Sequence, residues 1–220
     1  MSIKAIIFDL DGTLLDTIED ITNSMNEALI CQGLKPHSIE EYKSFVGSGV
    51  DILVNKVLSA QSAEIALFDV IKQQYLTNYL SKQNDLTKPY SGITTLLDTL
   101  KERNILVCVL SNKPDSDTQL VIQHYFGNYP FFQVVGKRKG YEVKPHPRSV
   151  NEMVQLLNLS TDEILYVGDT GVDMQTAVNA NLTAVGVLWG FRKKDELLQS
   201  GAEYIISHPS EIIDIIEKRG

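Results

Sequence analysis

The sequence predicts an α/β fold: a doubly wound parallel sheet, interrupted near its start by an all-helical insertion. From residue 91 onward, short apolar runs alternate with amphipathic stretches, whereas residues 17–86 show only the helical spacing of apolar residues. The apolar runs are almost continuous, which is typical of strands that helices cover on both faces. Another such run, residues 3–8, precedes the insertion and supplies the first strand of the same sheet.

This change of pattern predicts two domains. Residues 1–16 and 87–220 are expected to form the α/β catalytic core, and residues 17–86 a helical cap inserted after the first strand. The chain of 220 residues, 43% of them hydrophobic, is long enough to bury a full core.

Helices are expected throughout the cap. Apolar residues recur at helical spacing over 18–29, and Gly33 marks a stop. The stretch "SIEE" at 38–41 fits a capping box, in which a hydroxyl and a carboxylate bind the free amides of a helix start. Helical spacing continues over 50–58 and 63–80. The stretch "VGSGV" at 46–50 is either a loop whose amides touch substrate or only a helix connection.

In the core, strands and helices are expected to alternate. Strands are predicted at 105–111, 131–135, 164–169, 183–189 and 204–207, and helices at 92–104, 115–126, 148–159, 173–181 and from 210 onward. The basic run 192–194 is interpreted as a solvated helix start.

Charge and composition exclude several classes of protein. The formal net charge of −8 argues against a nucleic-acid binder that neutralises phosphates. A basic stretch followed by an apolar region is not found at the N-terminus, and no apolar run approaches the ~18 residues of a membrane span. Two cysteines cannot form a disulfide framework. We expect a soluble, cytoplasmic protein that binds neither nucleic acid nor membrane.

Polar residues follow several predicted strands at their carboxyl ends, where ligands bind in such sheets. Asp9 and Asp11 follow the first strand, Ser111 the second, and Asp169 the strand "ILYVG". Lys144 lies in the loop "EVKPHP", which Pro145 and Pro147 stiffen. Three carboxylates, a hydroxyl and a lysine are therefore expected to converge on one rim.

Such a set is suited to phosphate chemistry around a metal ion. Oxygen ligands without His or Cys favour Mg²⁺, which Asp9 and Asp169 could bind by side chain and Asp11 by its backbone carbonyl. Ser111 and Lys144 could then hold phosphate. Asp9 could attack phosphorus, and Asp11 could protonate the leaving oxygen and later deprotonate water.

Simpler interpretations remain open for each of these residues. "DLDGT" and "SNKPD" both suit turns. Lys144 could be solvated like its basic neighbours at 137–139. Asp173, four residues after Asp169, could merely complement a helix N-terminus.

Four motifs, in order, resemble those of the haloacid dehalogenase (HAD) superfamily: "DLDGT", the serine after the second core strand, "KPHP" and "GDTGVD". The resemblance implies a Rossmann-like core with a helical cap. It implies Asp9 as nucleophile, Asp11 as acid/base, Asp169 as a Mg²⁺ ligand and Asp173 as an outer-shell carboxylate. It also implies that Lys144 and Ser111 bind substrate phosphate, and we add Asn112, beside Ser111 in the second motif, as a substrate-binding candidate. The C-terminal stretch from "VGVLWGF" is similar to the phosphoglycolate phosphatase-like branch.

The expected function is that of a Mg²⁺-dependent phosphatase acting on a small phosphorylated metabolite such as 2-phosphoglycolate, as a monomer or homodimer. A pyrophosphatase or a sugar-phosphate mutase of the same superfamily is an alternative, although such mutases usually carry a histidine just after the first motif and this chain has none there. A phospho-accepting signalling module is disfavoured by the cap and by Asp11. A dehalogenase is disfavoured because its pattern lacks the second aspartate.

Overall fold

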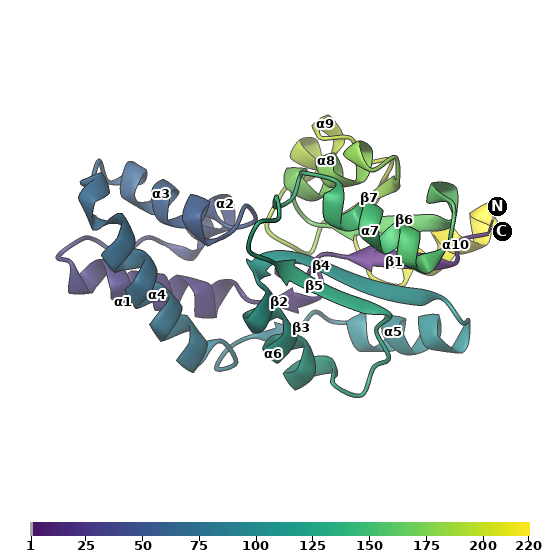
Figure 1. Ribbon diagram of the computed structural model, residues 1–220, viewed down its shortest axis with the longest axis horizontal. Coiled ribbons are helices and arrows are strands. Elements are labelled where there is room, and N and C mark those ends of the chain that lie inside the picture. The colour runs from purple at the N-terminus through teal and green to yellow at the C-terminus, as the bar shows by residue number, and fades with distance from the viewer. Residues whose placement is uncertain (1) are drawn as a thin grey trace.

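The structure, a computed structural model, describes residues 2–220, and within them a six-stranded sheet carries helices on both faces (Figure 1). All neighbouring strands of this sheet are parallel, in the order β5-β4-β1-β6-β7-β8. Its strands are β1 (Ala5–Phe8), β4 (Leu106–Pro114), β5 (Gln133–Lys137), β6 (Ile164–Gly168), β7 (Thr183–Val187) and β8 (Tyr204–Ile206). The predicted doubly wound sheet is confirmed.

Alternate residues of β1 serve two different cores, because successive side chains of a strand point to opposite faces. Ile6 and Phe8 pack with α5 (Ile93–Glu102), α6 (Asp115–Phe126) and α10 (Glu211–Arg219). Ala5 and Ile7 pack on the other face with α7 (Arg148–Leu157), α8 (Gly171–Asn179) and α9 (Lys194–Gln199). All four residues of β1 are completely buried, so the strand lies at the centre of the core.

The order of the strands creates a crevice beside β1. From β1 the sheet grows to one side through β4 and β5, and the chain then returns to β6 on the other side of β1. At such a reversal the connections leave the sheet in opposite directions, and the carboxyl ends of the adjacent strands border an open crevice. Here the crevice lies at the ends of β1, β4 and β6.

The inserted helices pack around a hydrophobic cluster of their own, at one end of the sheet (Figure 1). They are α1 (Ile18–Cys31), α2 (Ile39–Phe45), α3 (Val50–Ala60) and α4 (Phe68–Lys82), with a 3-10 turn at Ile65–Leu67. The capping box at the start of α2 is present, with Ser38 and Glu41 as its two members. We call α1–α4 the cap; its exact domain boundaries stay a prediction.

The two chain segments that join cap and core lie side by side. β2 (Leu15–Asp16) and β3 (Lys88–Pro89) form an antiparallel ladder that the sequence did not predict, since two residues carry no periodicity. Asp20, 2% exposed in the first turn of α1, accepts hydrogen bonds from the amide of Leu86 and from the amide and hydroxyl of Thr87. One buried carboxylate therefore fastens the returning segment to the outgoing helix.

We expect Asp20→Ala to destabilise the protein by about 1–3 kcal/mol, because it leaves buried donors of the returning segment without an acceptor. The midpoint of urea denaturation measures this loss. Asp20→Asn, which keeps one acceptor oxygen, should lose less. Equal stability of Asp20→Ala and the unaltered protein would show that water replaces the carboxylate.

Candidate active site

The turn after β1 brings Asp9 and Asp11 to the crevice. Asp9 continues the sheet, since its amide donates to the carbonyl of Val167 at 2.9 Å, and Leu10 is buried in the core. Gly12 has φ +90°, and a β-carbon at this position would overlap the carboxylate of Asp169. Glycine is therefore required at this position in "DLDGT", because it lets the turn approach β6 closely.

Three carboxylates and one lysine form a buried cluster at the strand ends. Asp9, Asp169 and Asp173 each offer a ligand atom within 4.8 Å of the others. Lys144, only 5% exposed, lies with Nζ 2.6 Å from Asp9 Oδ1 and 2.8 Å from Asp173 Oδ1. Lys144 is thus an internal cation and not a solvated one.

Asp173 has two structural roles at once. Its Oδ2 accepts hydrogen bonds from the amide and hydroxyl of Thr170 in a capping box at the start of α8, while its Oδ1 faces Lys144. The helix-capping interpretation is therefore correct but incomplete, because the same carboxylate also belongs to the buried cluster.

Burial and crowding shift the protonation of this cluster. Burial, helped by the charge of Asp173, holds the pKa of Asp9 well above its usual range against the opposing effect of Lys144. The same two causes raise the pKa of Asp169 to about 7. Burial alone would lower the pKa of Lys144, but the charges of Asp173 and Asp9 outweigh it and raise that pKa well above its usual value. One lysine does not balance three buried carboxylates.

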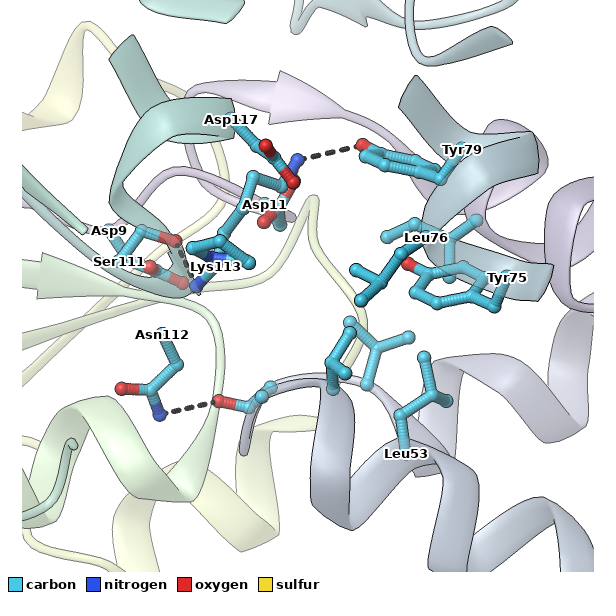
Figure 2. Close-up of a pocket in the computed structure, with 16 residues that line it drawn as sticks. Asp9, Asp11, Leu53, Tyr75, Leu76, Tyr79, Ser111, Asn112, Lys113 and Asp117 are labelled. Carbon is cyan, nitrogen blue, oxygen red and sulfur yellow. Dashed lines mark hydrogen bonds and ion pairs between the residues drawn. The ribbon is translucent and has the colours of Figure 1, made fainter. Parts of the chain in front are cut away.

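Asp11 points away from this cluster, towards a residue that the sequence analysis missed. Lys113 Nζ donates to Asp11 Oδ1 at 2.8 Å and to the hydroxyl of Tyr79 in α4 at 2.7 Å (Figure 2). Its position directly after Ser111 and Asn112, at the carboxyl end of β4, was the available signal.

Ser111 and Asn112 both line the crevice, with different freedom to bind a ligand. The hydroxyl of Ser111 accepts a hydrogen bond from the amide of Lys113 at 3.1 Å and keeps its proton for another acceptor. The side chain of Asn112 is occupied: its Oδ1 accepts from the amide of Lys144, and its Nδ2 donates to the carbonyls of Lys144 and Gly47. Its contacts with protein place the Lys144 loop and the cap.

A pocket that is partly open to solvent lies between this rim and the cap (Figure 2). Its floor contains Asp9, Asp11 and Ser111. Its roof is largely apolar, formed by Ile21, Val46, Val50, Leu53, Tyr75, Leu76 and Tyr79. Gly47 and Gly49 of the "VGSGV" loop also border it, so this loop both connects two helices and faces the pocket.

Comparison with known proteins places this architecture in a family. The haloacid dehalogenase-like hydrolase model matches residues 6–187, which include the cap and the sheet from β1 to β7. The chain belongs to the haloacid dehalogenase-like hydrolase family. The resemblance seen in the four motifs is thereby confirmed.

Relatives within the haloacid dehalogenase-like family carry a consistent name. The chain is 35% identical over 192 residues to a phosphoglycolate phosphatase of Rhodobacter capsulatus, covering 86% of each chain. It is 28% identical to that of Mannheimia succiniciproducens, covering 97% of this chain and 98% of the relative. A crystal structure from Lactobacillus delbrueckii subsp. bulgaricus superposes with a TM-score of 0.91 at 29% identity, covering 98% of this chain and 99% of that one.

The buried cluster suits the divalent metal that haloacid dehalogenase-like phosphatases generally use. All its donor atoms are carboxylate oxygens, and burial, together with the charge of Asp173, raises the pKa values of Asp9 and Asp169. Hard cations such as Mg²⁺ prefer such donors. Asp9 and Asp169 stay the predicted side-chain ligands, with Asp11 contributing only its backbone carbonyl.

Protons should compete with the metal at this site. Because the pKa of Asp169 is about 7, its carboxyl must release a proton to bind Mg²⁺ near neutral pH. We expect apparent Mg²⁺ affinity to fall by up to about tenfold per pH unit below 7.

Thermal unfolding with and without Mg²⁺ measures this competition. An acid whose pKa is raised on folding stabilises the metal-free protein at low pH, and this contribution is lost as the pH rises through about 7. Mg²⁺ should therefore raise the melting temperature more at pH 8 than at pH 6. Equal increases at both values would contradict the prediction.

Arg192 is largely buried, contrary to the expectation that the basic run 192–194 is solvated. Its guanidinium, in a side chain 12% exposed, donates to the backbone carbonyls of Lys43, Ser44 and Val46 at the end of α2. It therefore joins the core to the cap of this haloacid dehalogenase-like protein. The interpretation failed because its acceptors are backbone groups about 150 positions earlier in the sequence.

Across residues 2–220, the helices are all too short or too polar to cross a membrane.

Proposed function

We propose that the chain is a Mg²⁺-dependent phosphatase of small phosphate monoesters and that 2-phosphoglycolate is its substrate. One observation carries this proposal: Asp9, a buried carboxylate beside Lys144 and Asp169, faces a pocket that the cap encloses. The names of the relatives support the choice of ester. The cytoplasmic location and the monomeric or homodimeric state stay predictions.

The phosphoryl group would bind at the floor of the pocket. The hydroxyl of Ser111 donates to one phosphoryl oxygen, and the ammonium of Lys144, which now neutralises Asp9, attracts another. Asp9 and Asp169, with the backbone carbonyl of Asp11, would hold Mg²⁺, which would supply positive charge to the site. Together these contacts orient phosphorus towards the carboxylate of Asp9.

Asp9 and Asp11 then have different roles in the first step of the reaction. An oxygen of Asp9 attacks phosphorus while the bond from phosphorus to the ester oxygen breaks, and an aspartyl-phosphate forms. Asp11 donates a proton to the departing oxygen, which leaves as an alcohol.

Water completes the reaction. Asp11, now ionised, takes a proton from a water molecule that attacks the phosphorus of the aspartyl-phosphate. The bond from phosphorus to Asp9 breaks, and inorganic phosphate and the free carboxylate result. The apolar roof limits the amount of water in the pocket during this step.

A panel of phosphate esters with Mg²⁺ tests the function. We expect phosphate release from 2-phosphoglycolate with a kcat/KM at least ten times that for hexose phosphates, nucleoside monophosphates and pyrophosphate. Isomerisation of a sugar phosphate without phosphate release would favour the mutase, and preference for pyrophosphate would favour a pyrophosphatase. Absence of phosphate release from every ester would refute the proposal.

A further inference from the structure

The proposed reaction leaves Lys113 without a role, although this residue lies in the middle of the pocket. Within residues 2–220, Lys113 is the only cationic side chain that lines it. The residue is 9% exposed, so its ammonium is largely removed from water. A buried ammonium requires an anionic or polar partner.

The ammonium of Lys113 is held by one partner in the core, Asp11, and one in the cap, Tyr79. It lies 2.8 Å from Asp11 Oδ1, the carboxylate that handles the leaving oxygen, and 4.8 Å from the centre of the Tyr79 ring. Figure 2 shows it between the rim of the sheet and the cap tyrosine. It thus faces the part of the pocket that receives the alcohol portion of a substrate.

The other described residues that line the pocket leave the Lys113 ammonium as the one favourable partner for an anionic group. The roof offers mainly aliphatic and aromatic groups, which cannot compensate a desolvated charge. The other ionisable side chains facing the pocket from the core, Asp9, Asp11 and Asp117, are acidic and repel anions. An anionic group on the alcohol portion therefore has one place to bind.

We infer that Lys113 is a specificity-determining residue that binds a carboxylate on the alcohol portion of the ester, an inference that rests on the proposed function. In 2-phosphoglycolate the carboxylate is one methylene group from the ester oxygen that Asp11 would protonate, and Asp11 is the residue that pairs with Lys113. The substrate carboxylate replaces Asp11 as the partner of the ammonium, and Asp11 is released to face the ester oxygen. Short phosphorylated carboxylic acids are the substrate class that this exchange selects.

Two other roles are conceivable for the same contacts, and both make different predictions. Lys113 could serve only to hold the cap shut through Tyr79, in which case every substrate would depend on it equally. Alternatively, Asp11 and Asp117 could select an ammonium group on the substrate and use Lys113 merely for charge balance.

Three esters of similar size separate these roles: 2-phosphoglycolate, ethyl phosphate and O-phosphoethanolamine. We expect the unaltered protein to prefer 2-phosphoglycolate over ethyl phosphate at least tenfold in kcat/KM. Lys113→Met should lower kcat/KM for 2-phosphoglycolate by about 100-fold, the usual effect of truncating one partner of a buried charge pair, and change ethyl phosphate much less. Lys113→Arg, which keeps the charge, should retain part of the preference.

Tyr79→Phe is the matched control, since it removes the cap hydroxyl and leaves the ammonium. It should keep the preference for 2-phosphoglycolate, with circular dichroism confirming the fold of each variant. The inference is overturned if folded Lys113→Met loses all three esters equally, if the unaltered protein does not prefer the carboxylate, or if it prefers O-phosphoethanolamine. Absence of phosphate release from all three esters by the unaltered protein would instead count against the proposed phosphatase activity itself.

Discussion

Replacing Asp9 with asparagine is expected to abolish turnover, with a loss on the order of 10⁴-fold or more, as for other enzymes deprived of their nucleophile. The amide oxygen is a poor nucleophile, so no aspartyl-phosphate can form. Mass spectrometry of acid-quenched protein after mixing with substrate should show a phosphorylated species for the unaltered protein and none for Asp9→Asn.

The fold of Asp9→Asn should survive this change. The pKa of Asp9 is raised chiefly by burial, so the charged carboxylate is disfavoured in the metal-free protein and a neutral amide relieves repulsion from Asp173. We expect a metal-free melting temperature at least equal to that of the unaltered protein. A phosphorylated Asp9→Asn, or turnover within tenfold of normal, would show that another side chain is the nucleophile.

Asp11→Asn should give the second largest effect and a different time course. For an ester with a poor leaving group we expect a loss of about 10²–10⁴-fold, the usual contribution of a general acid–base group. The leaving group of p-nitrophenyl phosphate barely needs a proton, so the first step should remain fast with this ester while attack by water stays slow. Stopped-flow absorbance should therefore show a burst of p-nitrophenol followed by slow turnover.

Asp117→Asn is the control for this experiment, because Asp117 is another carboxylate that lines the same pocket. It should change the rate of p-nitrophenol release little and show no burst. If Asp9→Asn and Asp11→Asn give the same trace, and neither accumulates phosphoenzyme, the proposed division of roles is wrong.

The sequence was sufficient to predict the sheet because its strands are buried on both faces. β1, β6 and β7 contain only buried residues, so each reads as an almost uninterrupted apolar run. The positions of Asp9 and Asp169 follow directly, since both come at the carboxyl ends of these strands. β2 and β3 escaped prediction because two-residue strands have no measurable period.

The contacts between cap and core could not be predicted in the same way. Lys113 meets Tyr79, and Arg192 meets carbonyls at the end of α2, only because the cap and the core face each other in one orientation. Amphipathic spacing indicates which side of a helix is buried but not which partner covers it. The hydrophobic periodicity of the sequence therefore says least about the contacts of residues at the boundary between cap and core.

The ladder of β2 and β3 joins the cap to the core along one edge, as a hinge would. Figure 1 shows α2 on the other side of the boundary between cap and core, where Arg192 donates a hydrogen bond to the carbonyl of Val46. If the cap swings about the ladder, its α2 edge travels farthest, and the alcohol leaves there. In the proposed mechanism the alcohol departs while phosphate is still on Asp9, so the same opening that releases the first product would admit the water that removes the second. We therefore expect a fixed order of release, with alcohol first and phosphate last.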